Sequence, residues 1–293
     1  MRCFRTRAAA IVLGALALLL LPIGAASPPA SAAPLPLLNH FDWNICGGGG
    51  AGCAGGSLSA AYSAYDWAIT QTPSNHPLAI STQETCQSQY NWLAWALSNA
   101  GYQAAMQQAI TSSPSCGGVA YGNAIFWAGG CAGGSASTCV AASAFAHQVP
   151  GEQNRGYVCG RAVSLVTYTA CSAHMTNLTT TQGGKRIQTW QGEDYYAAIT
   201  FFNGLGTTTY GAGDFQLQPF QAEFPSAFHS TYDETDQGYW KNTVSGRKID
   251  YIWIPPSHMQ ITAQATVTVT GSDHYPYYGY MGLPRVWLTA VVT

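Results

Sequence analysis

Short apolar stretches bounded by Gly, Pro, Asn, Asp or Ser recur along most of this chain. Stretches of this kind are typical of β-strands. Loops are expected between them, over 130–137 and 230–241. The pattern predicts strands over 37–45, 78–82, 119–127, 157–165, 166–173, 207–215, 249–254, 261–270 and 286–292.

Three longer segments place apolar residues at helical spacing, and they predict helices over 57–70, 87–100 and 185–202. Ser57 is a candidate N-cap of the first helix, and Gly101 can end the second. Strands outnumber helices, and both kinds of element occur throughout the chain. The pattern therefore predicts an α/β (α+β) fold, with two sheets in a sandwich and helices outside, rather than a doubly wound parallel sheet.

The first 32 residues have the pattern of a secretory signal peptide. A lead with three arginines precedes an apolar run over 8–21, and Ala30-Ser31-Ala32 fits a cleavage site. A single membrane anchor is the alternative, but the basic flank and the small residues favour cleavage. We therefore expect a secreted, extracellular protein with one large domain over 37–293 and no stable membrane association after cleavage.

Composition narrows the classes of function. The leader holds three of the eleven Lys and Arg residues and none of the thirteen Asp and Glu residues, so the mature chain carries 8 − 13 = −5 formal charges. Tight, passive binding of nucleic acid depends on a basic surface, which this charge disfavours. An enzyme that reaches phosphates through a bound metal ion is still allowed.

Eight cysteines remain once Cys3 leaves with the leader, and an even number in an exported chain indicates disulfides. No Cys-x-x-Cys pair supports a zinc site, and spacing alone does not fix the connectivity. Two pairs bracket Gly-rich loops, a third lies in consecutive apolar segments, and the last two cysteines pair by default. The expected bridges are Cys46–Cys53, Cys131–Cys139, Cys159–Cys171 and Cys86–Cys116.

Acidic, amide and imidazole side chains stand where predicted strands begin or end. Asn44, Glu84 and Asp214 each close an apolar strand, Asp250 opens one, and Ser272-Asp273-His274 follows another. Strand ends converge on one rim of a sandwich, so these positions can assemble a single site. Carboxylates and imidazoles suit a hard divalent cation and phosphoryl chemistry.

Seven short motifs follow one another in a distinctive order. They are Trp43-Asn44, Gln83-Glu84-Thr85, Tyr121-Gly122-Asn123-Ala124-Ile125, Ala173-His174-Met175, Gly213-Asp214-Phe215, Lys248-Ile249-Asp250-Tyr251-Ile252 and Ser272-Asp273-His274-Tyr275-Pro276. The ordered set spans nearly the whole mature chain and resembles the endonuclease/exonuclease/phosphatase superfamily, also called the deoxyribonuclease-I-like fold. The resemblance implies a four-layer α/β/β/α sandwich of two mostly antiparallel sheets, and a phosphoester hydrolase that depends on Mg2+ or Mn2+.

The same resemblance assigns a metal side to the site. Glu84 would be the main metal ligand, Asn44 would support the metal or the phosphate, and Asp273 would complete the ligand set. Asn44 also has a plain structural alternative, since it could simply cap the turn before Gly47.

The remaining motif residues would act on the phosphate and the water. His274 is implied as a general acid/base or as a stabiliser of the phosphorane charge, and Asp250 would hold its imidazole. Asp214 would orient or activate the attacking water, and His174 would contact the scissile phosphate or protonate the leaving oxygen. His174 could otherwise be a core-edge histidine bonded to backbone.

One position departs from the family's pattern, which has Asn two residues after the aspartate of Gly-Asp-Phe. This chain has Gln216 there, an amide on a stem one methylene longer. Because misplacement of about 1 Å can cost roughly a hundredfold in rate, the change could slow or reshape the reaction, or a small backbone shift could accommodate it.

Three functions are open. We favour a phosphodiesterase or nuclease that cleaves nucleic acid, acting as a monomer. The alternatives are a hydrolase of lipid headgroups or small phosphoesters, for which the insert over 127–140 is the candidate lipid-facing hairpin, and a non-catalytic binding module. The tyrosine-rich segment 275–280 is expected to be a loop that packs or stacks on bases, and the acidic run 233–236 is expected to be solvated.

Overall fold

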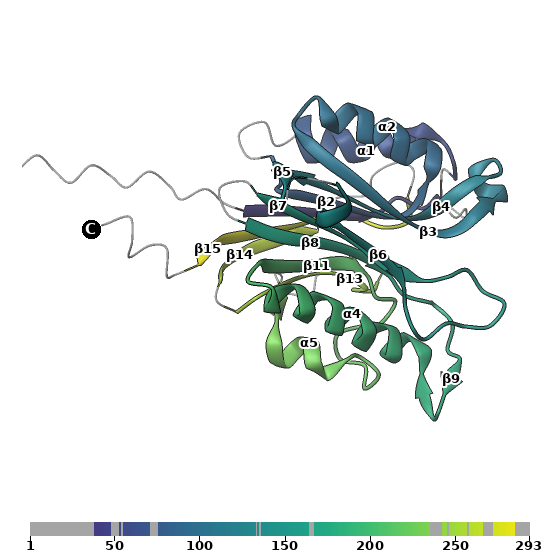
Figure 1. Cartoon of the computed structure of the whole chain (residues 1–293). Helices are drawn as coiled ribbons and strands as arrows, with labels where there is room; N and C mark the ends of the chain where they lie inside the picture. The colour runs from purple at the N-terminus through teal and green to yellow at the C-terminus, as the bar shows by residue number, and fades with distance from the viewer. Residues whose placement is uncertain are drawn as a thin grey trace, which may run out of the picture. The chain divides into compact units, whose positions relative to one another are not determined.

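The computed structural model describes residues 38–47, 53, 55–70, 76–132, 134, 136–163, 167–234, 242–244, 246–256, 258–265 and 272–284. These residues all belong to one compact unit, Pro36–Thr293. The predicted leader over 1–32 and the strand expected over 286–292 lie outside the described residues. Within the described part, two β-sheets lie face to face and the longer helices cover their outer faces (Figure 1).

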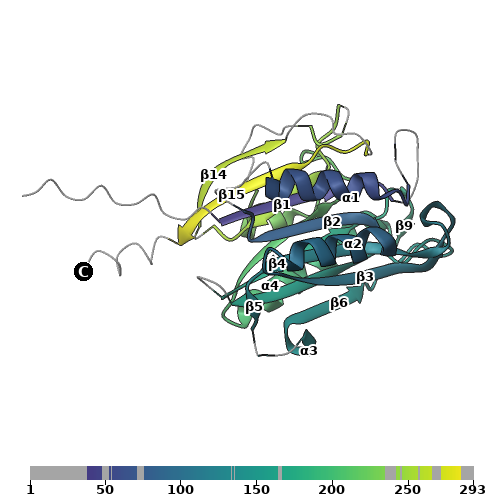
Figure 2. The ribbon, with the colours of Figure 1, turned by 90° about the horizontal axis from the view of Figure 1, so that it is seen from above.

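The first sheet has the strand order β14-β15-β1-β2-β4-β3 among the described residues. β1 and β2 run parallel, and every other neighbouring pair is antiparallel. Helices α1 and α2 lie over this sheet (Figure 2), and Ser57 caps α1 by accepting a hydrogen bond from Ser59 N, as predicted. The elements are β1 (Leu38–Asn44), α1 (Leu58–Tyr65) with a π-helical continuation (Asp66–Thr70), β2 (Ala79–Cys86), α2 (Gln87–Ser98), β3 (Tyr102–Ser113), β4 (Val119–Ala128), β14 (His258–Ala265) and β15 (Tyr277–Pro284).

The second sheet has the order β12-β13-β11-β8-β7-β5, with β6 also paired to β7. β8 and β11 are parallel, and the other described pairs are antiparallel. Helices α4 and α5 lie against its outer face (Figure 1). The elements are β5 (Gly130–Cys131), α3 (Ala136–Cys139), β6 (Val140–Ala144), β7 (Gly156–Val163), β8 (Thr167–His174), β9 (Thr181–Gln182), β10 (Lys185–Arg186), α4 (Ile187–Gly204), β11 (Thr208–Asp214), α5 (Ser226–Thr231), β12 (Asp233–Glu234) and β13 (Asp250–Ile254).

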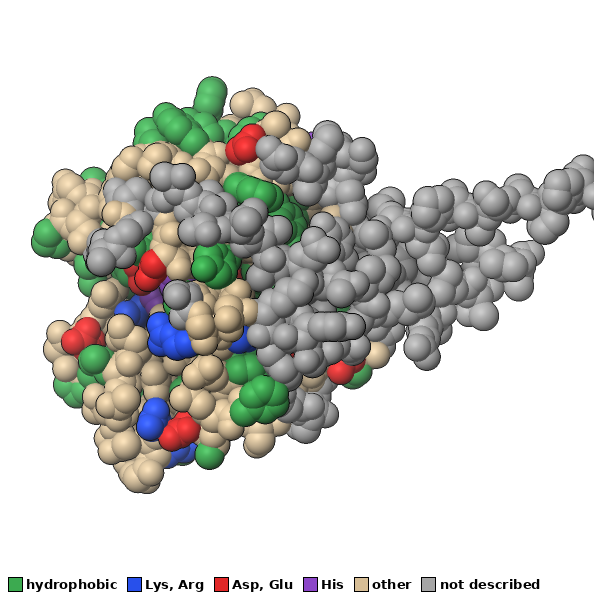
Figure 3. Space-filling model, turned by 180° about the vertical axis from the view of Figure 1, so that it is seen from behind, with side chains coloured by type: hydrophobic (Ala, Val, Ile, Leu, Met, Phe, Trp, Pro, Cys, Tyr) green, Lys and Arg blue, Asp and Glu red, His purple; other side chains and the backbone are tan. Residues whose placement is uncertain are grey.

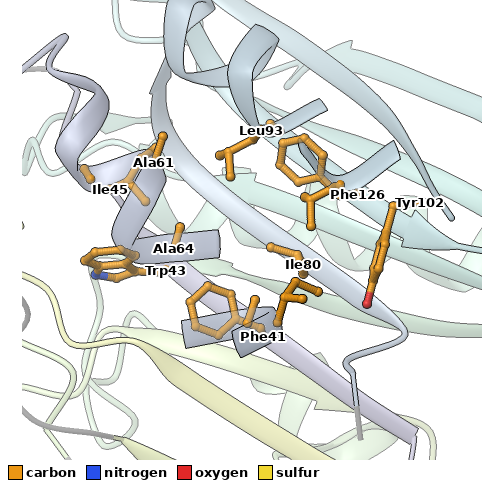
Figure 4. Packing of buried hydrophobic residues seen from close by; sticks show 14 of the residues in the cluster. Phe41, Trp43, Ile45, Ala61, Ala64, Ile80, Leu93, Tyr102 and Phe126 are labelled. Atoms are coloured by element: carbon orange, nitrogen blue, oxygen red, sulfur yellow. The ribbon is translucent and has the colours of Figure 1, made fainter. Parts of the chain in front are cut away.

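Alternation along β1 decides what each layer contains. Phe41 and Trp43 point to α1 and α2, where they pack with Ala61, Ala64 and Leu93 (Figure 4). The intervening side chains of β1 point to the other sheet, as strand geometry requires. Those side chains are His40, Asp42 and Asn44, all buried. The space between the two sheets therefore contains a polar strip that leads up to the rim where β1 ends.

The predicted four-layer α/β/β/α sandwich is confirmed, and most predicted strands and helices occur close to their expected bounds. The longer strands β3, β6 and β15 were not predicted, nor were the short elements β5, β9, β10, β12, α3 and α5, and the loop expected over 130–137 contains β5 and the start of α3. β3 is rich in Gln and Ala, so its alternation is faint, and β15 falls in the tyrosine-rich segment that was interpreted as a loop. That interpretation is wrong for Tyr277 and Tyr278, which are buried strand residues.

Two further expectations about single residues are wrong. The helical spacing of apolar residues over 87–100 predicts Trp95 on the buried side of the helix, but 64% of its surface is exposed. Glu234 was expected to be solvated, but it is buried, 3.3 Å from the buried Lys248 Nζ, and accepts a hydrogen bond from Tyr277. Buried charges are retained when they are paired, which sequence pattern alone does not reveal.

The four disulfides join the cysteines in the predicted combination: Cys46–Cys53, Cys86–Cys116, Cys131–Cys139 and Cys159–Cys171. None of the helices in the described part of the chain is long and apolar enough to cross a membrane.

Candidate active site

Three strands of the second sheet carry site residues side by side. Asp214 at the end of β11 lies directly opposite His174 of β8 on one side and Asp250 of β13 on the other. Adjacent strands are about 4.8 Å apart, so this register places the three side chains in one row. The sheet register therefore confirms that these residues, which are far apart in the sequence, meet at one rim.

The Ser272-Asp273-His274 motif, which precedes β15 of the first sheet, lies beside the same row of side chains. Ser272 Oγ donates to Asn44 O at 2.6 Å, and the Trp43 indole donates to His274 O at 2.9 Å. The end of β1 thus holds the segment before β15 through two side chain to backbone bonds. These bonds position His274 next to the site residues of the second sheet.

His274 and Asp250 form a buried pair. Nδ1 of His274 lies 3.1 and 3.0 Å from the two carboxylate oxygens of Asp250. Burial by itself would lower the pKa of His274, but the charge of Asp250, its hydrogen bond, and the charges of Asp214 and Asp273 together raise it to about 10. The ring is therefore a cation at neutral pH, with Nε2 facing Asp214 at 3.7 Å.

Asp214 is fully buried and surrounded by donors. Its Oδ2 accepts from Asn44 Nδ2 at 3.2 Å and from Gln216 Nε2 at 2.6 Å, and its Oδ1 accepts from Gln216 N at 2.9 Å. Burial and the charge of Asp250 raise the pKa of Asp214 to about 7, against the opposing effects of His274 and the hydrogen bonds. A carboxyl group with this pKa can take up or release a proton near neutral pH.

Glu84 is held in an unusual backbone conformation. β2 has a register irregularity between Thr82 and Thr85, and Glu84 has φ of +54°. Its carbonyl accepts from Gly47 N at 2.7 Å, and a Cβ at Gly47 would lie 2.1 Å from that oxygen, so only glycine fits. The described non-glycine residues with positive φ are Cys46, Glu84 and Gln216, all of which are at this site. Such strain is typical of functional positions.

Two residues outside the predicted set of site residues complete the site. Arg155, just before β7, is buried, and its Nη1 lies 2.7 and 2.9 Å from the ring nitrogens of His174. Burial, followed by the charges of Arg155 and His274, holds the pKa of His174 well below its usual range, so His174 is neutral. Tyr121 forms a side-chain hydrogen bond with Glu84. The motif containing Tyr121 was visible in the sequence, but no pattern distinguished Arg155 from other basic residues.

A divalent cation fits the residues present. The carboxylates of Glu84 and Asp214 lie 3.9 and 3.5 Å from His174 Nε2, and Asp273 lies 3.8 Å from His274 Nε2. Asp250 adds a fourth carboxyl group, so the acidic groups of the site outnumber its two cations, Arg155 and His274. Oxygen donors with this excess charge suit Mg2+ or Mn2+.

The described Asp214, Asp250 and His274 place their ligand atoms within 4.8 Å of one another, but all three are buried, and His274 and Asp250 are hydrogen-bonded to each other. The Glu84 and Asp273 side chains are 20% and 51% exposed, so they have more room for a cation. Asn44 Oδ1 accepts from Cys46 N at 2.9 Å, which supports its role as a turn cap and leaves one lone pair. The predicted ligand set Asn44, Glu84 and Asp273 stays a prediction.

The longer stem of Gln216 is accommodated by the backbone. In its left-handed conformation, Gln216 folds back so that both its backbone N and its Nε2 donate to Asp214. We expect Gln216→Asn to keep kcat within about threefold, because Asn adopts this conformation readily and retains the amide. Gln216→Ala should lower kcat by roughly 10- to 100-fold, since a hydrogen bond to a charged group contributes about 1.5–3 kcal/mol. Equal losses in steady-state assays of the two variants would contradict this account.

Comparison with known proteins supports the architecture. No family model matches the chain, and no curated protein matches its sequence. Among solved structures, the human Nocturnin catalytic domain with bound sulfate is 17% identical over 84% of this chain and 93% of that chain, with a TM-score of 0.61. An endonuclease/exonuclease/phosphatase from Beutenbergia cavernae is 16% identical over 85% and 72%, with a TM-score of 0.62. D. rerio TDP2, complexed with a single-strand DNA product, is 13% identical over 84% and 99%, with a TM-score of 0.57. This chain therefore has the fold of these endonuclease/exonuclease/phosphatase proteins, as its motifs predict.

Proposed function

We propose that this protein is a secreted, Mg2+- or Mn2+-dependent phosphodiesterase that cleaves nucleic acid. The proposal rests on two titratable side chains that have different pKa values and lie next to each other. Asp214, with a pKa near 7, lies 3.7 Å from Nε2 of His274, which Asp250 keeps cationic. Near neutral pH Asp214 can therefore accept a proton while His274 stays cationic, and acid–base chemistry at a phosphate can use both properties.

Each residue then has a role that follows from its surroundings. Asp214, oriented by Asn44 and Gln216, accepts the proton of the attacking water as the ester P–O bond breaks. His274 donates a hydrogen bond to a phosphoryl oxygen as negative charge develops. His174 is neutral, which favours a hydrogen-bonding role at the phosphate over the predicted proton-donor role.

Glu84, Asn44 and Asp273 would hold the divalent cation, which supplies Lewis-acid polarisation of the phosphoryl oxygen when bound. Arg155 adds a fixed positive charge beside His174, in a position to contact a phosphate. In Figure 3, acidic, histidine and basic side chains lie close together on one face of the molecule.

The choice of nucleic acid over lipid rests on two observations. TDP2, which shares this fold, binds a single-strand DNA product. The insert over 127–140 was the candidate lipid-facing hairpin, but its described part is β5 and the short α3, joined by the Cys131–Cys139 disulfide, with Cys139 buried. The non-catalytic alternative is disfavoured because every predicted acid and both histidines of the site are present.

Metal removal tests the proposal directly. We expect cleavage of plasmid DNA or RNA in Mg2+ or Mn2+, its loss in chelator, and its recovery when metal is restored. Glu84→Gln should lower the rate about 100-fold or more at fixed metal, whereas Glu152→Gln, which removes the same charge from an exposed position, should not. Full activity in chelator would contradict the metal role. Cleavage only of sphingomyelin or a small chromogenic phosphodiester would reassign the substrate.

A further inference from the structure

A hollow of about 290 Å3, including space open to solvent, lies on the outer face of the second sheet. It forms where β7 changes its edge partner. Gly160 pairs with β6 and Ala162 pairs with β5, so Arg161 falls at the break between them. The Cys131–Cys139 disulfide joins β5 to the last residue of α3, directly before β6, and the end of α4 forms the opposite wall.

The half-buried side chain of Arg161 lines the hollow, and no acidic side chain among the described residues pairs with its charge. Its Nε is buried and makes no hydrogen bond, and no ion pair of Arg161 occurs among the described residues. A donor removed from water without a compensating bond is costly, and more so when it carries charge. The planar fork of an arginine matches the oxygens of a carboxylate or phosphate. An oxyanion in the hollow could therefore pair with the charge of Arg161.

The walls of the hollow are mixed in character. Thr169, which lies opposite Arg161 on β8, contributes a buried hydroxyl near the floor. Phe202 and Leu205 of the α4 end contribute apolar surface, and Leu205 is 49% exposed. An apolar group attached to the anion would cover this surface and gain about 25 cal/mol for each Å2 removed from water.

The hollow is separate from the proposed catalytic row, which is formed by His174, Asp214, Asp250 and His274. Thr169 precedes His174 by five residues on β8, which is roughly 16 Å along a strand. The two positions also face opposite sides of the sheet. Ser172 accepts a hydrogen bond from Gln83 of the first sheet, so Ser172 and His174 point toward that sheet. Cys171 and Thr169 point to the opposite face, where Cys171 packs with residues of α4.

We propose that this hollow is a second binding site, which takes a small organic anion. Arg161 binds the carboxylate or phosphate, and a short apolar group of the ligand lies against Phe202 and Leu205. The Gly-rich insert over 127–140, which the catalytic function does not use, builds one wall of this site with its disulfide.

The test uses the full mature protein in chelator, so that no cation occupies the catalytic row. Benzoate, phenyl phosphate and inorganic phosphate are titrated separately while the Arg161 Nε–H resonance is followed by NMR. We expect saturable shifts in the millimolar range, with benzoate and phenyl phosphate binding more tightly than inorganic phosphate. Arg161→Gln, with binding measured by calorimetry, should raise the Kd for benzoate at least about tenfold.

Three further variants test whether binding depends on the charge, the planar fork and the apolar wall of the hollow. Arg247→Gln removes the same charge from an exposed position and should leave benzoate binding unchanged. Arg161→Lys should retain part of the affinity, because it keeps the charge without the fork. Leu205→Asn should weaken the binding of benzoate and leave the binding of inorganic phosphate unaffected.

The absence of a saturable shift with any probe, or equal weakening of benzoate binding by Arg247→Gln and Arg161→Gln, would overturn the proposal. Unfolding midpoints of each variant separate loss of binding from loss of fold.

Discussion

His274→Ala is expected to lower kcat for phosphodiester cleavage by about three orders of magnitude or more. The ring is a cation. Its hydrogen bond with Asp250 orients it so that Nε2 lies 3.7 Å from the Asp214 carboxylate. A positioned acid or base contributes roughly 10²–10⁴-fold, and removal of a preorganised donor to the developing charge costs about 10²–10³-fold. His274 is such a donor, and its charge also lowers the pKa of Asp214, the proposed base, so its loss should impair both groups.

Steady-state kinetics at saturating metal measure this effect. His76→Ala removes an exposed histidine and serves as the matched control. KM should change less than kcat, because the lost interaction is made mainly in the transition state. A His274→Ala protein that keeps more than about a tenth of wild-type kcat would contradict the assignment.

The pH profile distinguishes a chemical role from a structural one. Asp214 must be ionised to accept a proton, so activity should rise through its pKa of about 7 and fall as His274 loses its proton near 10. Asp250→Asn removes a charge that raises both pKa values, so both limbs should move to lower pH. A purely structural role for Asp250 would reduce activity without moving the limbs.

The candidate site was visible in the sequence because polar side chains interrupt apolar strands at their ends. The sequence could not reveal that Asp214 stands between His174 and Asp250, since that follows from the order β8-β11-β13. Arg155 was equally hidden. It precedes a strand without any distinguishing pattern, and only the packing of β7 against β8 brings it to His174.

β1 shows why the rest of the core was harder to predict. Its alternation of apolar and polar residues is the usual pattern of a strand with one face in water. In this fold the polar face is buried against a second sheet, so His40 and Asp42 form part of an internal network with Ser81. The Lys248–Glu234 pair was missed for a similar reason, because charged residues near a loop are usually solvated.

Asp42 gives this internal network a measurable consequence for stability. It is fully buried, Gln83 and Ser81 both donate to its Oδ1, and its Oδ2 has no hydrogen-bond partner. Burial, followed by the charge of Asp250, raises the pKa of Asp42 to about 8, against the opposing hydrogen bonds. The folded protein therefore holds this group in its neutral form at pH values where the unfolded chain would ionise it.

Asp42→Asn should consequently stabilise the protein, and the gain should depend on pH. A carboxyl group whose folded pKa lies above its unfolded value opposes folding increasingly as pH rises from the unfolded pKa to the folded one. The free energy of unfolding of Asp42→Asn relative to wild type should therefore be near zero at pH 4 and increase until about pH 8. Because a tenfold change in proton affinity corresponds to about 1.4 kcal/mol, the gain should reach the order of 5 kcal/mol. The asparagine keeps the acceptor for Gln83 and Ser81 and carries no charge.

Urea denaturation from pH 4 to pH 9, in chelator so that no bound cation contributes, measures the difference directly. Glu152→Gln removes an exposed charge and controls for the change in net charge. A difference between Asp42→Asn and wild type that stays constant with pH would mean that the folded state does not hold Asp42 neutral. A difference that grows with pH would establish that a buried carboxyl group beneath the catalytic row destabilises the fold above neutral pH, where the proposed chemistry is fastest.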